Sequence, residues 1–286
     1  MPVLSGGRHR ATRRSVVPAH PGLWWVVAAA VGVVLAVVVL VAQPWAPDEG
    51  AAEIGPPAGW QRVFADEFGG ATLDRDVWQP DRSGDLAGIP FNPVAEDAWF
   101  SPGNVSVADG SLVLTVREER RTLDGRAYGR STGMVQSNDA IPLGPGRYVE
   151  ARIRFPECPG CWPAFWLHPL DRWPPEIDIA EYLESGSENR PSFNYIDPAE
   201  DKTGPDMYGD PDVDHRDAFH TYGVLWEDDR VVPYLNGRAY PELAATEDLT
   251  GLPMMIILNL SVRGGYETEP GARMLVDWVR VWAPSP

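Results

Sequence analysis

Short runs in which apolar and polar residues alternate recur along this 286-residue chain, and they constrain its fold more than any other feature. The clearest runs are residues 104–107, 111–116, 148–155, 221–226, 254–260 and 274–282. Alternation with a period of two indicates β-strands, and turn-forming pairs such as Asp109-Gly110 and Asn236-Gly237 separate the runs. Many short strands at close spacing are typical of an antiparallel sandwich or barrel, so we expect an all-β fold.

One run carries three carboxylates within six residues, namely Glu176, Asp178 and Glu181, with apolar residues between them. On a regular strand Glu176 and Asp178 share a face, and a β-bulge before Glu181 would return its side chain to that face. Like charges on one face destabilise a sheet, so their presence together indicates a functional use for the carboxylates. The residues themselves leave two interpretations open: a metal site, or a protonated carboxyl beside a carboxylate for acid/base chemistry.

Three tryptophans, Trp162, Trp166 and Trp173, come shortly before the acidic run. Indole rings stack on the apolar faces of sugar rings, and two carboxylates facing one cleft are the minimal apparatus for glycoside hydrolysis. Because Trp162 and Trp173 stand beside prolines and at the ends of runs, we expect them to line a sugar-binding cleft. Trp166 is a third candidate, for which packing in the core is an equally good interpretation.

An uninterrupted apolar stretch occupies residues 23–42 and follows a basic segment at 1–22. About 20 apolar residues suffice to span a bilayer, and the preceding arginines place the N-terminus in the cytoplasm. We therefore expect a cytoplasmic tail at 1–22, a transmembrane anchor at 23–42, a Pro/Gly-rich linker at 43–59 and an extracellular domain at 60–286. The alternative is a cleaved secretory signal, whose apolar core is normally shorter, and in both cases the domain is exported.

The charge of the exported part excludes several classes of partner. The chain has a formal net charge of −17, and residues 1–22 hold four of its 24 basic residues and none of its 41 acidic ones. The remainder, with 20 basic against 41 acidic residues, repels nucleic acids and sulfated polymers. There is no glycine-rich phosphate loop and no His/Cys cluster at metal-ligand spacing. We expect a monomer without a nucleic-acid partner.

The segment from Glu176 to Glu181 resembles the E-x-D-x-x-E active-site signature of glycoside hydrolase family 16, of the laminarinase or endo-β-1,3-glucanase type. Further blocks resemble the family in the same order: residues 66–68 with Trp78, and 146–153, 162–167, 219–226, 234–237, 258–265 and 276–281. The resemblance extends over nearly all of residues 60–286. It implies a concanavalin A-like jelly-roll β-sandwich, placed after the N-terminal transmembrane helix, whose concave sheet lines an open cleft.

The same resemblance implies an activity and assigns roles to the acids. The expected reaction is retaining hydrolysis of a β-glucan polysaccharide by double displacement, most simply by an endo-β-1,3-glucanase. Glu176 would be the nucleophile, Glu181 the general acid and then the base, and Asp178 the assisting carboxylate. No cofactor is required for this catalysis.

The resemblance also suggests residues outside the acidic run. The candidate substrate-binding residues, besides the tryptophans, are Glu150, Arg152, Asn194 and His220. Family members often carry a structural calcium away from the cleft. The positions that match its ligands are Glu67, Gly110 through its backbone carbonyl, and Asp277.

Three positions near the acids depart from the family pattern. Pro175 stands before Glu176 where the family usually has Gly, Asn194 stands where His is frequent, and Arg263 precedes a glycine pair where a small residue is common. These departures leave the polysaccharide open, with mixed-linkage glucan, agar, carrageenan or xyloglucan, or transglycosylation, as alternatives. Pro175 also motivates an alternative from another class, a carbohydrate-binding jelly roll without hydrolysis.

The two cysteines, Cys158 and Cys161, lie in the segment that leads to Trp162. No thioredoxin-like βαβ pattern surrounds them, and disulfides persist outside the cell. We expect a local disulfide that braces the wall of the cleft, with two free buried thiols as the alternative.

Overall fold

The computed structural model describes residue 56 and residues 59–286, apart from 140, 170–171, 184–189, 198, 200–201, 204–207, 211, 213, 217 and 246–251. The expected cytoplasmic tail, transmembrane helix and most of the linker lie outside these residues. Within the described part of the chain, no helix is both long and apolar enough to cross a membrane.

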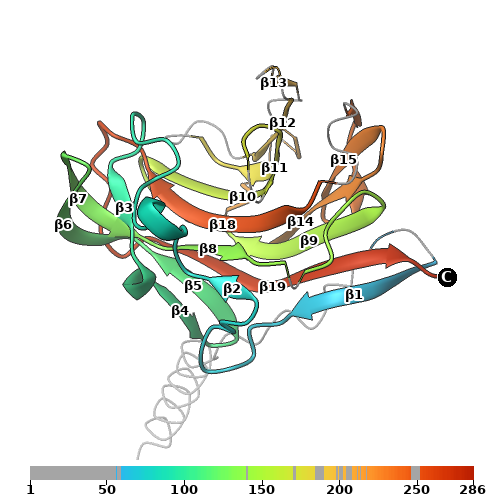
Figure 1. Ribbon diagram of the computed structural model, residues 1–286, viewed down its shortest axis with the longest axis horizontal. Helices are drawn as coiled ribbons and strands as arrows, with labels where there is room; N and C mark the ends of the chain where they lie inside the picture. Colours follow the sequence, from blue (N-terminus) through green and yellow to red (C-terminus); the bar gives the residue numbers. More distant parts are fainter. Residues whose placement is uncertain are drawn as a thin grey trace, which may run out of the picture. The chain divides into compact units, whose positions relative to one another are not determined.

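Strands form nearly all the regular structure of the described residues, and most of them belong to two large sheets (Figure 1). The inner sheet runs in the order β13 (Lys202–Thr203), β12 (Ser192–Ile196), β11 (Glu176–Glu181), β10 (Cys161–Pro169), β18 (Met254–Val262), β8 (Met134–Ser137) and β2 (Trp78–Gln79). Its neighbouring strands all pair antiparallel.

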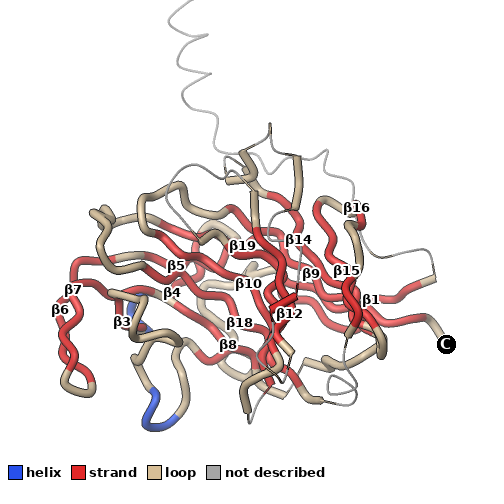
Figure 2. The backbone as a smooth tube through the Cα atoms, turned by 90° about the horizontal axis from the view of Figure 1, so that it is seen from above, coloured by secondary structure: helices blue, strands red, loops and turns tan. Residues whose placement is uncertain are grey.

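The outer sheet runs in the order β16 (Arg238–Ala239), β15 (Arg230–Leu235), β14 (His220–Trp226), β9 (Arg147–Arg154), β19 (Arg273–Pro284), β5 (Ser111–Thr115) and β4 (Val105–Ala108). Two more strands join it, β1 (Trp60–Asp66) on β19 and β17 (Leu243–Ala244) on β15. A smaller sheet contains β3 (Ala98–Phe100), β7 (Arg126–Thr132) and β6 (Arg117–Leu123), and Figure 2 shows the β6–β7 hairpin at one side of the molecule. Short 3₁₀ helices lie at Gly84–Leu86 and Pro102–Asn104.

The core lies between the two large sheets, because alternate residues of each strand point into the space that separates them. Phe165 and Ile177 fill it from the inner sheet, and Val149 and Val279 fill it from the outer sheet; all four are fully buried. This arrangement confirms the predicted all-β jelly-roll sandwich.

Strand β18 differs from the half-exposed strands, since all nine of its residues are buried. One face of β18 belongs to the core, for example Leu258, and the other packs Met255 and Ile257 in a second cluster with Trp166. Both faces of the inner sheet are therefore covered at β18, one by the core and the other by groups that border a pocket.

The predicted irregularity of β11 is present. Its pairing with β10 matches Ala180 to Phe165 and Asp178 to Trp166, so Ile179 is an extra residue at a register shift. The pairing with β12 shifts between Asp178 and Glu181. The bulge turns Glu181 back to the face that carries Glu176 and Asp178, as the alternation of the sequence suggested.

Candidate active site

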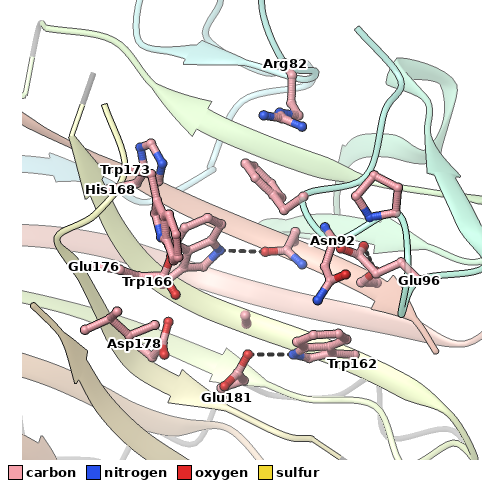
Figure 3. A pocket seen from close by; sticks show the side chains of 16 residues that line it. Arg82, Asn92, Glu96, Trp162, Trp166, His168, Trp173, Glu176, Asp178 and Glu181 are labelled. Atoms are coloured by element: carbon pink, nitrogen blue, oxygen red, sulfur yellow. Dashed lines mark hydrogen bonds between the residues drawn. The ribbon is translucent and has the colours of Figure 1, made fainter. Parts of the chain in front are cut away.

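A pocket of about 530 Å³ lies on the face of the inner sheet that points away from the core (Figure 3). The acidic run and the tryptophans before it supply six of its lining residues: Trp162, Trp166, Trp173, Glu176, Asp178 and Glu181. Residues that the sequence did not single out also line it: Arg82, Phe91, Asn92, Glu96, His168, Asn259 and Ser261. The pocket therefore combines carboxyl groups with indole rings, as the sequence predicted.

Strand β11 brings the three acids into the pocket. Ile177, Ile179 and Ala180 point into the core, and this leaves Glu176, Asp178 and Glu181 on the opposite face. Apolar burial of the three intervening side chains thus holds the carboxylates in place despite their mutual repulsion.

Each glutamate of the trio accepts a hydrogen bond from an indole. Trp173 Nε1 donates to Glu176 Oε2 over 2.8 Å, and Trp162 Nε1 donates to Glu181 Oε1 over 2.6 Å. Trp173 leaves 49% of its surface exposed, so its ring remains available at the rim of the pocket. Because the two glutamates receive the same kind of donor, these hydrogen bonds do not distinguish the nucleophile from the acid.

Glu176 has a raised pKa in the pocket. Burial raises the pKa of Glu176 to about 7, against the hydrogen bonds from Trp173 and Asp178, and the charge of Glu181 raises it as well. A carboxyl that ionises near pH 7 beside a second carboxyl is the arrangement expected of a pair that exchanges one proton during catalysis.

Asn194 on β12 contacts the acids and is fully buried. Its Nδ2 donates to Asp178 Oδ2 over 3.2 Å and to Glu181 Oε2 over 3.5 Å. Asn194, which the sequence suggested as a substrate-binding residue, thus orients the carboxylates. The pairing of Asp178 with Asn194 across β11 and β12 places it there.

Trp166 serves both of the roles that the sequence left open. It is 6% exposed, packs edge-on against Phe91 with ring centroids 4.7 Å apart, and yet lines the pocket. Its Nε1 donates to Asn259 Oδ1 over 2.7 Å, which fixes the plane of the indole.

Three candidate substrate-binding residues lie elsewhere and are corrected here. Glu150 and Arg152 are on β9 and His220 is on β14, both strands of the outer sheet. Glu150 is fully buried and accepts a hydrogen bond from Trp282 Nε1 over 3.0 Å. Although β9 and β10 follow each other in the sequence, the chain crosses from one sheet to the other between them, so none of the three lines the pocket.

The positions that match the calcium ligands meet on the outer sheet. Strand β19 pairs with β1 through Val279 and with β5 through Val276, so Glu67, Gly110 and Asp277 come close to the junction of these strands.

At this junction, the carboxylates of Glu67 and Asp277 are each paired with an arginine. Glu67 accepts two 3.0 Å hydrogen bonds from Arg280, and Asp277 accepts one of 2.6 Å from Arg152. The described residues hold no group of three His, Cys, Asp or Glu side chains that could bind a metal. Two guanidinium groups beside these carboxylates do not fit a divalent cation there, because like charges repel.

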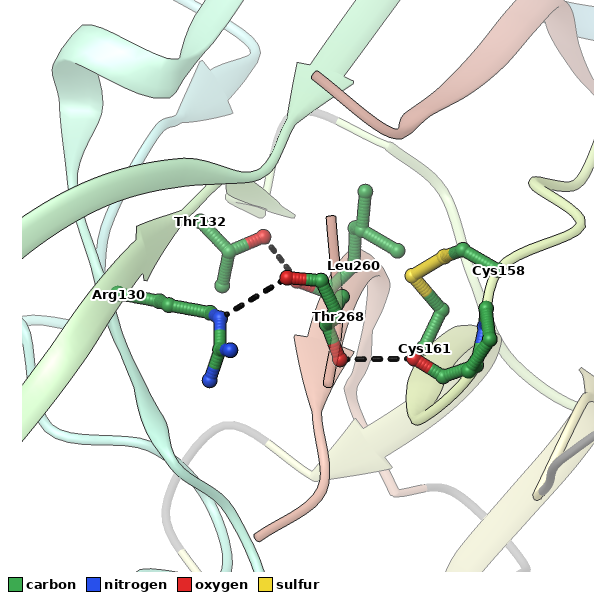
Figure 4. The surroundings of a disulfide bond; sticks show 7 residues. Arg130, Thr132, Cys158, Cys161, Leu260 and Thr268 are labelled. Atoms are coloured by element: carbon green, nitrogen blue, oxygen red, sulfur yellow. Dashed lines mark hydrogen bonds between the residues drawn. A yellow bond between two sulfur atoms is a disulfide. The ribbon is translucent and has the colours of Figure 1, made fainter. Parts of the chain in front are cut away.

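Cys158 and Cys161 are joined by a disulfide in the loop before Trp162 (Figure 4). Thr268 Oγ1 donates to Pro159 O over 2.7 Å, and Arg263 N donates to Gly160 O over 2.8 Å. Gly160 has a φ of +72°, and a side chain there would overlap the ring of Tyr266. The disulfide loop is thus fastened to the segment that follows β18, directly before Trp162, which lines the pocket.

The structure shows the contacts of two residues that depart from the family pattern, Arg263 and Pro175. The guanidinium of Arg263 lies 5.8 Å from the centre of the Trp162 ring, and its Nη1 donates to Leu183 O over 3.1 Å. Pro175 is buried directly before Glu176, and Trp173 folds back to reach that glutamate. Pro175 thus borders Glu176 directly, whereas Arg263 borders Trp162, the indole that donates to Glu181.

The fold and the pocket together define a class: a jelly-roll protein that presents paired carboxyl groups beside indole rings on its concave sheet. The model of the family described as Glycosyl hydrolases family 16 matches residues 94–280. The chain therefore belongs to glycosyl hydrolase family 16, whose catalysis needs no cofactor.

Known relatives and solved structures agree with this assignment. The chain is 29% identical over 245 residues to Endo-1,3-1,4-beta-glycanase EglC of Rhizobium meliloti (strain 1021), which covers 78% of this chain and 51% of the relative. It is 26% identical over 280 residues to Glucan endo-1,3-beta-glucosidase A1 of Niallia circulans, which covers 84% of this chain and 41% of the relative. The chain thus spans about half, or less, of the length of these relatives.

Among solved structures, the laminarinase catalytic domain from Thermotoga maritima MSB8 has a similar fold. The TM-score is 0.69 at 26% sequence identity, with 79% of this chain and 99% of that chain covered.

Proposed function

We propose that this protein is a retaining endo-β-1,3-glucanase that hydrolyses a neutral β-glucan. The observation that carries the proposal is the set of three carboxyl groups that a bulged strand places on one face of a pocket, with an indole N–H on each glutamate. The names of the relatives, which include two endo-acting enzymes on β-1,3-linked or β-1,3-1,4-linked polymers, support this substrate class.

In the first step, a carboxylate oxygen of Glu176 attacks the anomeric carbon while the protonated Glu181 gives its proton to the glycosidic oxygen. The bond between that carbon and the leaving sugar breaks, and a glycosyl ester on Glu176 remains. The hydrogen bond with Asp178 favours the charged carboxylate of Glu176, which must attack, and so opposes the larger effect of burial, which raises the pKa of Glu176 to about 7.

In the second step, Glu181 takes a proton from a water molecule, and the water oxygen attacks the anomeric carbon of the ester. The ester bond breaks, Glu176 returns to its carboxylate form, and Glu181 is protonated again. Two displacements on one carbon restore its original configuration, so the product forms as the β-anomer.

Hydrolysis of laminarin tests the proposal. The purified protein is incubated with this β-1,3-glucan, and new reducing ends and the sizes of the products are measured over time. Oligosaccharides of several lengths are expected early, because an open cleft admits the middle of a chain. Absence of new reducing ends with every neutral β-glucan would refute the proposal, and binding without cleavage would indicate a carbohydrate-binding module instead.

The linkage preference is tested on a panel that adds mixed-linkage glucan, xyloglucan, agar and carrageenan. We expect the highest kcat/KM on laminarin and low activity on the sulfated polymers, because the part of the chain after residue 22 carries 20 basic against 41 acidic residues. A higher rate on mixed-linkage glucan would move the proposed specificity to that polymer, and larger products than the starting chains would indicate transglycosylation.

We also propose that the domain acts as a monomer outside the cell, held at the membrane by residues 23–42. The length of that apolar segment and the arginines before it support this placement. Protease treatment of intact cells that express the full chain is the test. Digestion should remove the domain and leave a short membrane-bound fragment, whereas release of the intact domain into the medium would indicate a cleaved signal.

A further inference from the structure

The pocket contains a fourth carboxyl group, Glu96, for which the proposed reaction has no role. Glu96 lies just before β3, is 3% exposed and forms an isolated β-bridge with Arg263 at the end of β18. In Figure 3 it lies with Asn92 at the side of the pocket opposite Glu176. A buried acid at such a position costs free energy to desolvate, so a fold keeps it only where it is held and used.

The carboxyl of Glu96 is held firmly. The backbone N–H of Asn92 donates to Oε1 over 2.6 Å, and the hydroxyl of Ser261 hydrogen-bonds Oε2. Its backbone is fixed as well, since Arg126 Nη2 donates to Glu96 O over 2.8 Å. The side chain is thus preorganised and has little rotamer freedom to lose when a ligand arrives.

The groups that face Glu96 come from three parts of the chain. Arg82 on the loop after β2 and Arg126 on β7 bring positive charge, and Ser261 on β18 brings a hydroxyl. Burial nevertheless raises the pKa of Glu96 to about 7. Near neutral pH the carboxyl can therefore both accept and donate a hydrogen bond, which suits a sugar hydroxyl, because that hydroxyl does both.

Asn92, Glu96, Asn259 and Ser261 form what we call the recognition cluster. Asn259 and Ser261 project from alternate positions of β18 and pair with Ala164 and Trp162 on β10. Asn259 and Ser261 are separated from the acids of β11 by strand β10. In Figure 3, Asn92 and Glu96 lie on the side of the pocket that carries Trp162. Polar groups next to an aromatic wall match the alternation of hydroxyl groups and apolar faces on a sugar ring.

We infer that Glu96, together with Asn92, binds hydroxyl groups of the sugar unit next to the one whose bond is cleaved, and that this contact sets the preference for chain length and linkage. The inference rests on the proposed glucan hydrolysis. A linkage at a different carbon turns the neighbouring ring and moves its hydroxyls, so a carboxyl fixed in the wall of the pocket discriminates between linkages. If Glu96 only anchored the segment between β2 and β3, its loss would affect all linkages alike.

The test uses the full chain and a series of β-1,3-linked glucose oligosaccharides of increasing length. Glu96→Gln, Glu96→Ala and Asn92→Ala are compared with the wild type by kcat and KM on each substrate. For oligosaccharides long enough to reach the cluster, we expect kcat/KM to fall roughly 10- to 100-fold, mainly through KM, as the loss of a hydrogen bond to a charged group implies. For the shortest substrate that is cleaved, the change should be several-fold smaller.

Glu119→Gln is the matched control. Glu119 on β6 also accepts a hydrogen bond from a serine hydroxyl, that of Ser131 over 2.8 Å, but it does not line the pocket. This variant should behave like the wild type on every substrate. Thermal unfolding of each variant shows whether the fold is intact, and the isosteric Glu96→Gln keeps the test valid where Glu96→Ala does not fold.

The outcomes separate the inference from the proposed function. If the wild type cleaves every oligosaccharide and the Glu96 variants lose kcat/KM by the same factor at every length, the inference is overturned and the proposed function stands. If the wild type cleaves no oligosaccharide of the series, both the proposed function and this inference are overturned. A length-dependent loss supports both.

Discussion

Both large sheets of the sandwich carry carboxylates, and two pairs on the outer sheet differ from the pocket acids in their donors. On the outer sheet, guanidinium groups reach Glu67 and Asp277, from Arg280 and Arg152, whereas the buried Glu150 accepts from the indole of Trp282. On the inner sheet, Glu176 and Glu181 accept hydrogen bonds from the indoles of tryptophans. A guanidinium supplies a full opposite charge, whereas an indole supplies only a dipole.

The difference separates structural from reactive carboxyl groups. Ion pairs on the outer sheet fasten β1 and β9 to β19. In the pocket, burial raises the pKa of Glu176 on the inner sheet and of Glu96 before β3 to about 7, so these groups can change their protonation near neutral pH. Substitutions in the inner sheet should therefore change activity, and those in the outer sheet should change stability.

The largest effect is expected from the glutamates on β11. Glu176→Gln and Glu181→Gln each remove a carboxylate without changing its size, and kcat on laminarin should fall by roughly 10²- to 10⁴-fold. The temperature of unfolding should fall little or rise, because repulsion among the acids is relieved. Near wild-type activity of either variant would contradict the assigned roles.

A smaller effect concerns Glu96 and the pH dependence of stability. Its pKa of about 7 in the folded protein exceeds its ordinary value of 4.5, so the folded state binds more protons than the unfolded state between these pH values. The free energy of unfolding therefore falls as pH rises through this window, by up to about 3 kcal/mol from this group.

Urea unfolding at a series of pH values measures this contribution. Glu96→Gln cannot titrate at this position, so its stability should fall less than that of the wild type between pH 4.5 and about 7. Parallel stability curves for the two proteins would show that Glu96 does not hold a proton in that window.

In the outer sheet, Arg280→Met should lower the free energy of unfolding by about 2 kcal/mol, because it leaves Glu67 without its bidentate partner in a partly exposed site. The kcat/KM on laminarin should stay unchanged, since the pair lies on the sheet opposite the pocket. A chelator such as EDTA should leave the unfolding temperature of the wild type unchanged. A marked decrease with EDTA, restored by calcium, would show that a cation and not arginine stabilises this junction.

The smallest effect is expected at the hydrogen bond between Trp162 and Glu181. Trp162→Phe keeps an aromatic ring at the pocket wall but removes the N–H that donates over 2.6 Å. The kcat should fall about tenfold, which corresponds to one hydrogen bond to a charged group. Trp226→Phe, a change of a buried tryptophan in the outer sheet, is the matched control and should lower stability without this loss of kcat.

Local sequence pattern was sufficient for the acidic strand. The alternation around Ile177 and Ile179 determines which side chains enter the core, and one extra residue before Glu181 has only a bulge to accommodate it. The resemblance that suggested Glu150 and Arg152 did not indicate their sheet, and a pattern with period two could not supply it, because it gives the two faces of a strand but not the sheet to which the strand belongs.

The recognition cluster could not be predicted from the local sequence pattern, for a different reason. Glu96 stands in a stretch with little periodicity, and its hydroxyl partner Ser261 is 165 residues away along the chain. Such a pair is brought together only when β18 and the segment between β2 and β3 pack. The length of that segment without a periodic pattern, which is typical of binding sites, was the one available signal.

The central claim is that Glu176 and Glu181 hydrolyse a β-glucan by double displacement. Proton NMR of a laminarin digest, recorded before the anomers of the product equilibrate, tests it most directly. The account predicts that the β-anomer appears first with the wild type, and that Glu176→Gln forms no product at the same enzyme concentration. Initial release of the α-anomer, or unchanged product formation by Glu176→Gln, would contradict it.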